Sequence, residues 1–160
     1  MSKMKGQEQF LRQAIDLATK NVTSGAGGPF GAVIVRDGVV IATGANCVTA
    51  SNDPTAHAEV TAIRNACAAL GTFQLSGCTI YSSCEPCPMC LTAILWARLD
   101  RLVFGSTAAD AAQGGFDDSH FYEQVRLDVF DRALPTENLL RDEARVSFDT
   151  WRQTVDKVKY

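Results

Sequence analysis

The sequence has no apolar run near the roughly 20 residues that a membrane-spanning helix needs. Secretory signals place an apolar segment between a basic start and a cleavage site. The first residues here carry Lys3 and Lys5 but no such segment. We therefore expect a protein of the cytoplasm that does not associate with membranes.

The chain also lacks any strongly basic stretch. Its formal net charge is −3, and its isoelectric point is about 5.3. From Arg101 onward, 11 acidic residues stand against 8 basic ones. Proteins that bind nucleic acid usually carry a basic stripe or patch, so we do not expect nucleic acid as a partner.

Six cysteines are present, and their spacing divides them into two groups. An even number in a small secreted domain would suggest disulfides. Here Cys84, Cys87 and Cys90 follow one another at intervals of three residues, and in a chain without an export signal such clustering favours metal binding. The other three are expected to be small buried apolar side chains, namely Cys47, Cys67 and Cys78.

Two short motifs indicate the chemistry of the chain. His57 and Glu59 stand two residues apart, and Pro86 precedes the pair Cys87 and Cys90. His57, Cys87 and Cys90 supply three metal ligands, whereas a structural zinc site normally fills all four positions with protein atoms. The open position admits a water molecule, whose pKa zinc lowers toward about 7. With Glu59 as proton carrier, the motifs predict zinc-dependent hydrolysis.

Both motifs are expected in the first turns of helices. Cys87 and Cys90 are three residues apart and so lie on one helix face. Helix N-termini carry a partial positive charge, which favours the thiolate form that a metal needs. We expect the helix that starts near His57 to face the Cys87 helix around one ion.

A purely structural role for these residues is the alternative interpretation. A lone C-x-x-C pair is common in structural zinc sites and in redox motifs. A closed site of His57, Cys84, Cys87 and Cys90 is possible by number, but Cys84 precedes the turn at Pro86 and should point elsewhere. A structural site also has no need of Glu59, so the hydrolytic interpretation is favoured.

The pattern along the chain predicts one α/β domain over residues 1–160. Helices are expected over 7–20, from 55 or 56 to 70, over 87–98 and over 148–157, and strands over 30–36, 39–43, 78–83 and 101–105. Asp37-Gly38 is a hairpin signal, Gly71 a helix end, and residues 108–118 are expected to be irregular. Two antiparallel strands followed by strand–helix alternation indicate a mixed sheet with helices on both faces.

The segments 51–60, 83–90 and 115–118 resemble those of the cytidine deaminase-like zinc deaminases, and within that superfamily they resemble the bacterial guanine deaminases. The likeness extends from about Ala26 to Tyr160. It implies a three-layer α/β/α fold with a mixed five-stranded sheet and one Zn²⁺ per subunit. It also implies hydrolysis of guanine at C2 to xanthine and ammonia.

The resemblance places substrate contacts on Asn46, Asp118 and Tyr160, with Phe30 and Trp96 as apolar walls. Asn46 offers a donor and an acceptor to a purine edge, and an ionised Asp118 accepts N–H groups. Other interpretations stay open: Asn46 as a loop residue, Asp118 as a solvated neighbour of a helix cap, and Trp96 as core.

Where this family usually has a polar residue after Asn46, the chain has Cys47. The resemblance further implies a homodimer in which a segment over about 137–160 crosses to the partner's site and forms a lid. Three alternatives to a guanine deaminase remain. They are a tRNA adenosine deaminase, a deaminase of a related ring such as guanosine, cytosine or a triazine, and an inactive zinc-stabilised binding subunit.

Overall fold

The structure, a computed structural model, describes residues 2–160. The chain forms two compact units, residues 1–122 and Glu123–Tyr160. Among the described residues, no helix is both long and apolar enough to cross a membrane. The expectation of one domain over 1–160 stays a prediction.

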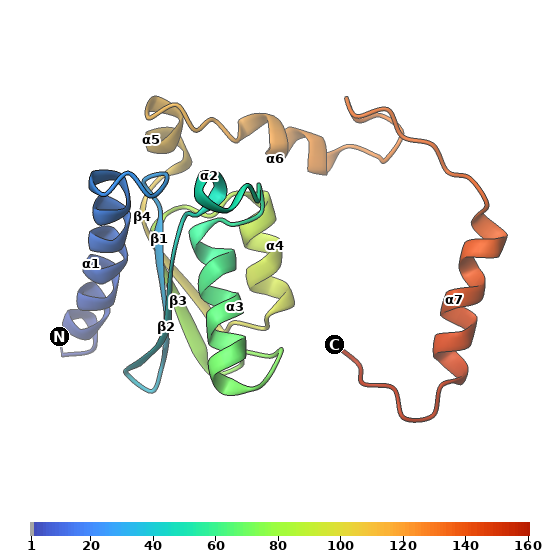
Figure 1. The fold of residues 1–160 in the computed structure, drawn as a ribbon, viewed down its shortest axis with the longest axis horizontal. Helices are drawn as coiled ribbons and strands as arrows, with labels where there is room; N and C mark the ends of the chain where they lie inside the picture. The colour runs from blue at the N-terminus through green and yellow to red at the C-terminus, as the bar shows by residue number, and fades with distance from the viewer. Residues whose placement is uncertain (1) are drawn as a thin grey trace. The chain divides into compact units, whose positions relative to one another are not determined.

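A four-stranded mixed sheet forms the centre of the first unit (Figure 1). Its strands are β1 (Gly31–Arg36), β2 (Val39–Ala45), β3 (Cys78–Cys84) and β4 (Arg101–Ser106), in the order β2-β1-β3-β4. β1 pairs antiparallel with β2 and β3, and β3 pairs parallel with β4. Asp37 and Gly38 have φ of 52° and 78°, as the predicted two-residue hairpin turn requires.

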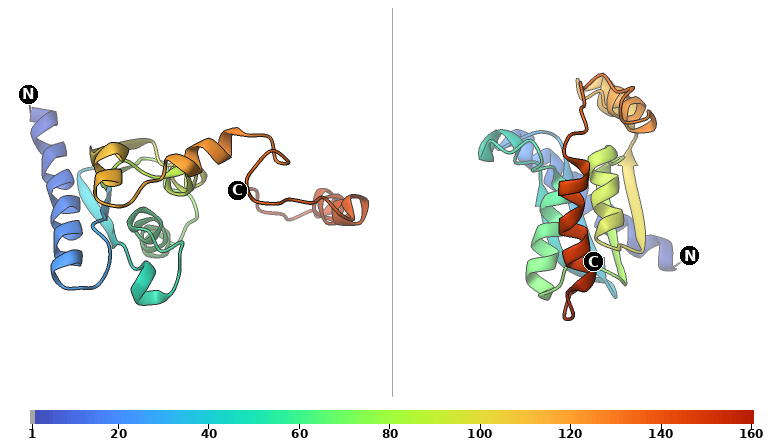
Figure 2. Two further views of the ribbon diagram at one scale, coloured as in Figure 1. Left: turned by 90° about the horizontal axis from the view of Figure 1, so that it is seen from above. Right: turned by 90° about the vertical axis from the view of Figure 1, so that its right-hand side faces the viewer.

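Helices cover both faces of this sheet, as expected (Figures 1 and 2). α1 (Ser2–Thr23) packs on one face, where Ala14 meets Val33 and Tyr81. α3 (Ala58–Leu70) and α4 (Pro88–Trp96) pack on the other face over Ile34 and Ile80. The unit therefore has the expected three layers.

The expectation of a fifth strand is wrong for the described residues, because the chain beyond β4 forms helices. Thr107 caps α5 (Ala108–Gln113) through a reciprocal pair of bonds with Asp110, so much of the segment expected to be irregular is helical. α6 (Ser119–Arg126) follows at once. The outer edge of β4 has no neighbouring strand in the described chain.

Close packing between β2 and α3 places the start of α3 beside the sheet. A Cβ atom at Gly44 would lie 2.3 Å from the carbonyl oxygen of Ala58 and 2.4 Å from the backbone nitrogen of Ala62. Only glycine at position 44 allows the backbones of β2 and α3 to come this close. The close contact holds the first turn of α3 against β2. The position of His57, one residue before α3, depends on this contact.

The second unit carries α7 (Arg141–Gln153), which begins seven residues earlier than the predicted helix over 148–157. None of residues 123–160 is buried. The large apolar side chains of α7, Val146, Phe148 and Trp151, are 59%, 69% and 42% exposed. The second unit therefore has no apolar core of its own, and its large apolar side chains form an exposed surface.

Candidate metal and substrate site

Two helix starts bring the predicted metal ligands together. His57 is the N-cap of α3 and Cys87 the N-cap of α4, each one residue before the first turn in which it was expected. Neither side chain caps its own helix, so both are available to a ligand. Cys90 lies in the first turn of α4 and is fully buried. Pro88 opens α4, where its missing N–H is not needed.

The distances within this group fit a tetrahedral zinc ion. His57 Nδ1 lies 3.6 Å from Cys87 Sγ and 3.4 Å from Cys90 Sγ, and all three ligand atoms lie within 4.8 Å of one another. Zinc binds sulfur at about 2.3 Å and imidazole nitrogen at about 2.0 Å, which puts tetrahedral neighbours about 3.5 Å apart. The donor set of one imidazole and two thiols is one that zinc prefers.

The charges in the group also suit a metal. A hydrogen bond from Cys90, together with His57, lowers the pKa of the Cys87 thiol well below its ordinary value, which favours the thiolate. The neighbouring Cys87 sulfur raises the pKa of His57, and it also raises that of Cys90. An ion that releases these protons replaces the shared hydrogen bonds by metal–ligand bonds.

Cys84 takes no part in this group, so the four-ligand structural alternative does not apply to the described residues. Cys84 is the last residue of β3, and its thiol donates to the carbonyl oxygen of Thr107 at 3.6 Å. Burial raises its pKa to about 11, which keeps it a neutral thiol.

Glu59 lies beside the ligands, in the first turn of α3, and is only 4% exposed. Its Oε2 accepts from Cys90 Sγ at 3.3 Å and its Oε1 from Ser82 Oγ at 3.1 Å. Burial raises the pKa of this carboxyl above its ordinary value. A carboxyl with a raised pKa next to a metal group is suited to accept and return a proton.

A cavity of about 580 Å³ opens onto the ligands within the first unit. Three of the predicted substrate contacts line it: Phe30, Asn46 and Asp118. Phe30 meets Phe116 edge to face, with ring centroids 5.0 Å apart. The rest of the lining is mainly small or apolar and includes Gly25, Gly27, Gly28, Val48, Ala111 and Phe121.

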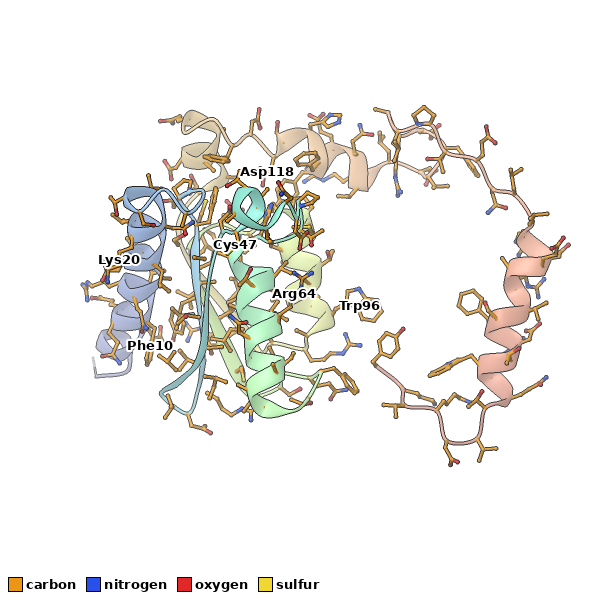
Figure 3. All side chains as sticks on the ribbon, in the orientation of Figure 1. Phe10, Lys20, Cys47, Arg64, Trp96 and Asp118 are labelled. Carbon is orange, nitrogen blue, oxygen red and sulfur yellow. The ribbon has the colours of Figure 1, made fainter. Side chains whose placement is uncertain are left out.

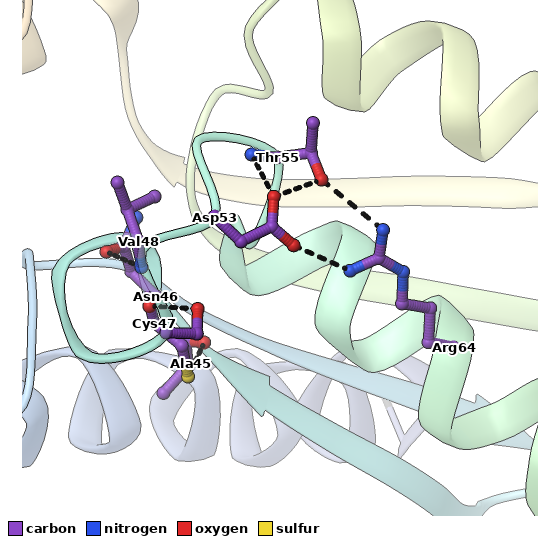
Figure 4. Close-up of polar contacts among 8 residues, drawn as sticks. Ala45, Asn46, Cys47, Val48, Asp53, Thr55 and Arg64 are labelled. Carbon is purple, nitrogen blue, oxygen red and sulfur yellow. Dashed lines mark hydrogen bonds and ion pairs between the residues drawn. The ribbon is translucent and has the colours of Figure 1, made fainter.

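Asn46 is buried at the end of β2, where the backbone fixes the orientation of its amide (Figure 4). Its Oδ1 accepts from the backbone N–H groups of Gly28 and Val48, at 3.4 Å and 3.3 Å. Two donors at one oxygen identify that atom as the acceptor, so the Nδ2 side remains for a ligand. The loop interpretation and the binding interpretation of Asn46 are therefore compatible.

Asp118 lies at the same end of the first unit as Cys47 (Figure 3). Burial, followed by the charge of Cys87, raises the pKa of its carboxyl. Tyr122, one helical turn along α6, donates its hydroxyl to the carbonyl oxygen of Pro86 at 2.7 Å and so ties α6 to the turn before Cys87.

Two predicted substrate residues are placed differently. Trp96 lies on the outer side of α4, is 61% exposed and does not line the cavity (Figure 3). The guanidinium of Arg98 lies 5.6 Å from the centre of the Trp96 ring. Tyr160 belongs to the second unit and is 75% exposed.

Cys47 and the loop that follows it precede His57. Cys47 is half-buried, and its thiol donates to the carbonyl oxygen of Ala45 at 3.2 Å (Figure 4). Asp53 accepts from the N–H and hydroxyl of Thr55, and Arg64 of α3 donates to both residues. These contacts fasten the loop to α3 directly before the first metal ligand.

Sequence reasoning missed two buried polar side chains near the site. Ser82 bonds to Glu59, and Asn21 donates to the carbonyl oxygens of Gly28 and Asn46 at 2.8 Å and 2.9 Å. Their signal is weak, since each is a single polar residue in a mostly apolar row. Phe116 could have been predicted, because it directly precedes the acidic pair Asp117 and Asp118.

Comparison with known proteins supports this site. Residues 4–106 match the family described as the cytidine and deoxycytidylate deaminase zinc-binding region. Guanine deaminase of Bacillus subtilis (strain 168) is 51% identical over 153 residues, covering 96% of this chain and 98% of that protein. The X-ray structure of the B. subtilis guanine deaminase superimposes with a TM-score of 0.93.

More distant relatives match a smaller part of the chain. A tRNA-specific adenosine deaminase of Aquifex aeolicus is 41% identical over 110 residues, covering 69% of this chain and 71% of that protein. The structure of guanine deaminase from Nitrosomonas europaea is 30% identical and covers 85% of this chain and 71% of that one, with a TM-score of 0.65.

Proposed function

The chain belongs to the cytidine and deoxycytidylate deaminase family and is a homologue of guanine deaminase, and from this premise we propose that it hydrolyses guanine to xanthine and ammonia. The observation that carries the proposal is the buried Glu59 carboxylate beside the group His57, Cys87 and Cys90, with Glu59, His57 and Cys87 lining one cavity. The net reaction consumes one water and releases the exocyclic amine at C2.

His57, Cys87 and Cys90 would hold the metal, and a bound zinc ion supplies a water of lowered pKa at that position. Glu59 accepts the proton that this water releases as it attacks C2. Glu59 would then pass this proton to the ring nitrogen beside C2. It would next take the proton of the new C2 hydroxyl and deliver it to the amine, so that the C2–N bond breaks, ammonia leaves and the C2 carbonyl of xanthine forms. The raised pKa of Glu59 favours this return of the proton.

The cavity lining supplies contacts for a purine base. Asn46 presents its Nδ2 donor to an acceptor on the purine edge, because its oxygen already bonds to the backbone. Asp118 accepts from ring or amine N–H groups of guanine. Phe30, held by Phe116, provides an aromatic surface against which the ring packs. The role of Trp96 as a wall finds no support in the cavity lining.

We further propose that the protein is a cytoplasmic homodimer in which residues of about 137–160, ending at Tyr160, cover the partner's site. The support is that no residue of 123–160 is buried, although this segment is rich in large apolar side chains. A second copy of the chain could bury these exposed apolar side chains in a dimer interface. The lid would exclude water from the cavity during the reaction.

Ammonia release tests the proposal. Zinc-replete protein is given guanine, guanosine, cytosine, cytidine and a tRNA anticodon stem-loop in parallel, and Glu59→Gln is the matched control because it keeps the size of the side chain. We expect release from guanine, and a fall of at least about 100-fold in Glu59→Gln. Release of ammonia from the stem-loop or from a nucleoside instead would show that guanine is not the substrate. Full activity of Glu59→Gln would show that Glu59 is not the proton carrier.

A further inference from the structure

Ser82 occupies a position where the pattern of its strand calls for an apolar residue. Alternate residues of β3 face α3 and α4, and the two that precede Ser82 in this row, Cys78 and Ile80, are fully buried core residues. Ser82 pairs across the sheet with Ala32, which belongs to the same core. Ser82 itself is 2% exposed, so its hydroxyl is removed from water.

A hydroxyl buried in this way is unfavourable unless it has a hydrogen-bond partner. The partner here is Glu59, whose Oε1 accepts from Ser82 Oγ at 3.1 Å. Glu59 is buried as well, and its other oxygen, Oε2, lies 3.3 Å from Cys90 Sγ. The two carboxylate oxygens therefore face different neighbours: Oε1 faces the sheet, and Oε2 faces the metal ligands.

We infer that Ser82 is a positioning residue for the reaction: its hydroxyl anchors Oε1 of Glu59 so that Oε2 is held toward the reacting groups. This inference rests on the proposed role of Glu59 as the proton carrier. A glutamate side chain has three rotatable bonds, and the α3 backbone alone does not fix where its carboxylate points. Proton transfer depends on this geometry, since the donor and acceptor must stay within hydrogen-bond reach.

The inference predicts a particular kinetic pattern. Ser82 does not line the cavity, so its loss leaves the binding of a purine base unchanged. Misplacement of a catalytic group by about 1 Å lowers rates by as much as about 100-fold. We therefore expect removal of the hydroxyl to lower kcat by roughly 10- to 100-fold with KM little changed.

Four variants separate the hydroxyl from the volume of the side chain. Ser82→Ala removes the hydroxyl. Ser82→Thr and Ser82→Val introduce side chains of nearly equal size, of which only threonine carries a hydroxyl. Ser83→Ala is the matched control, because Ser83 is its buried neighbour and bonds to the backbone N–H of Gly31 instead of to Glu59. For each variant, kcat and KM with guanine, zinc content and the Kd of xanthine are measured.

We expect Ser82→Ala and Ser82→Val to be slow, and Ser82→Thr and Ser83→Ala to approach the wild-type kcat, with zinc content and xanthine affinity equal throughout. A crystal structure of Ser82→Val should show the Glu59 carboxylate in a different rotamer. Wild-type kcat in Ser82→Val, or a Ser82→Thr as slow as Ser82→Val, overturns the inference. Loss of zinc from Ser82→Ala also overturns it, because the role would then be structural.

The Glu59→Gln variant separates this inference from the proposed function. If Glu59→Gln is inactive while Ser82→Val is fully active, Glu59 keeps its role and only the anchoring by Ser82 fails. If Glu59→Gln retains full activity, the proposed mechanism fails, and the inference about Ser82 fails with it.

Discussion

At the scale of single residues, His57 and Cys87 occupy helix N-cap positions without bonding to the N–H groups of their own helices. Most N-cap side chains accept such a bond and stabilise the helix start. Here the two side chains turn toward each other and toward Cys90, at 3.4–3.6 Å. The two helix starts consequently depend on whatever binds between them.

Metal removal should therefore reduce stability as well as activity. We expect chelation to abolish deamination and to lower the thermal midpoint by about 5–10 °C, with both restored by zinc, because metal binding is coupled to folding. Calorimetry and metal analysis measure the two effects. Cys90→Ala should bind no zinc, whereas Cys47→Ser, outside the ligand group, should bind one equivalent. A chelated protein that melts at the holoprotein temperature would contradict this coupling.

The spacing of residues was enough to predict the metal group and Glu59, because ligands three residues apart on a helix and a carboxylate two residues from a histidine are local patterns. His57 lies 30 and 33 residues from the two cysteines, but each of the two motifs carries its own metal-binding residue types. Ser82 and Asn21 escaped prediction because a single serine or asparagine in an apolar row carries no such signal, and their partners, Glu59 and Asn46, lie 23 and 25 residues away. Only the packed sheet brings such residues together. Short motifs therefore predict the reacting groups, whereas the residues that position them become visible only in the folded structure.

At the scale of elements, α1 and β2 are joined at the rim of the cavity by Asn21. This side chain, near the end of α1 and 7% exposed, donates to the backbone carbonyl oxygens of Gly28 and Asn46. Gly27 lies against the same place, and a Cβ there would come within 2.2 Å of the Asn46 carbonyl oxygen. Asn21 thus holds the loop that contains Gly27 and Gly28 against Asn46, the residue proposed to bind the base.

The isosteric variant Asn21→Asp should weaken substrate binding. It loses the donor and places an acidic oxygen against two carbonyl oxygens, which should cost about 1–3 kcal/mol of stability and raise KM for guanine several-fold. Asn65→Asp is the control, since Asn65 donates to a backbone carbonyl oxygen of β2, that of Thr43, from an exposed position. Urea unfolding and steady-state kinetics test both variants, and equal KM values would argue against the role of Asn21.

Among the elements, the four observed strands were predicted nearly to their ends. The hairpin at Asp37-Gly38 and the short apolar runs of β3 and β4 are strong local signals. α5 was missed because its six residues lie next to Gly114-Gly115, and its stability comes from the Thr107 cap more than from periodicity. The fifth strand was implied by the resemblance alone, and in the described residues the chain after β4 adds no strand to the sheet.

At the scale of the whole molecule, residues 123–160 form a unit without buried side chains. Phe148 and Trp151 stand three residues apart on α7 and so share one helix face. If this face packs on a second copy, replacing it with charge should prevent association. We expect Phe148→Glu combined with Trp151→Glu to convert a dimer to a monomer and to lower activity at least tenfold.

Analytical ultracentrifugation measures this change, and Glu143→Gln, which alters charge on α7 without touching Phe148 or Trp151, should remain dimeric. A wild-type protein that sediments as a monomer would exclude the swapped dimer. A double variant that stays dimeric and active would show that the α7 face is not the interface.

The order of the metal ligands along the chain has a consequence for biosynthesis. All of them lie between residues 57 and 90, and the unit that contains them ends at Tyr122. Ribosomes add about 5–20 residues per second, and N-terminal units fold first, so synthesis of the remaining tail takes a few seconds more. A nascent chain can thus acquire zinc before it meets a second copy. Binding of zinc therefore does not have to wait for two subunits to associate.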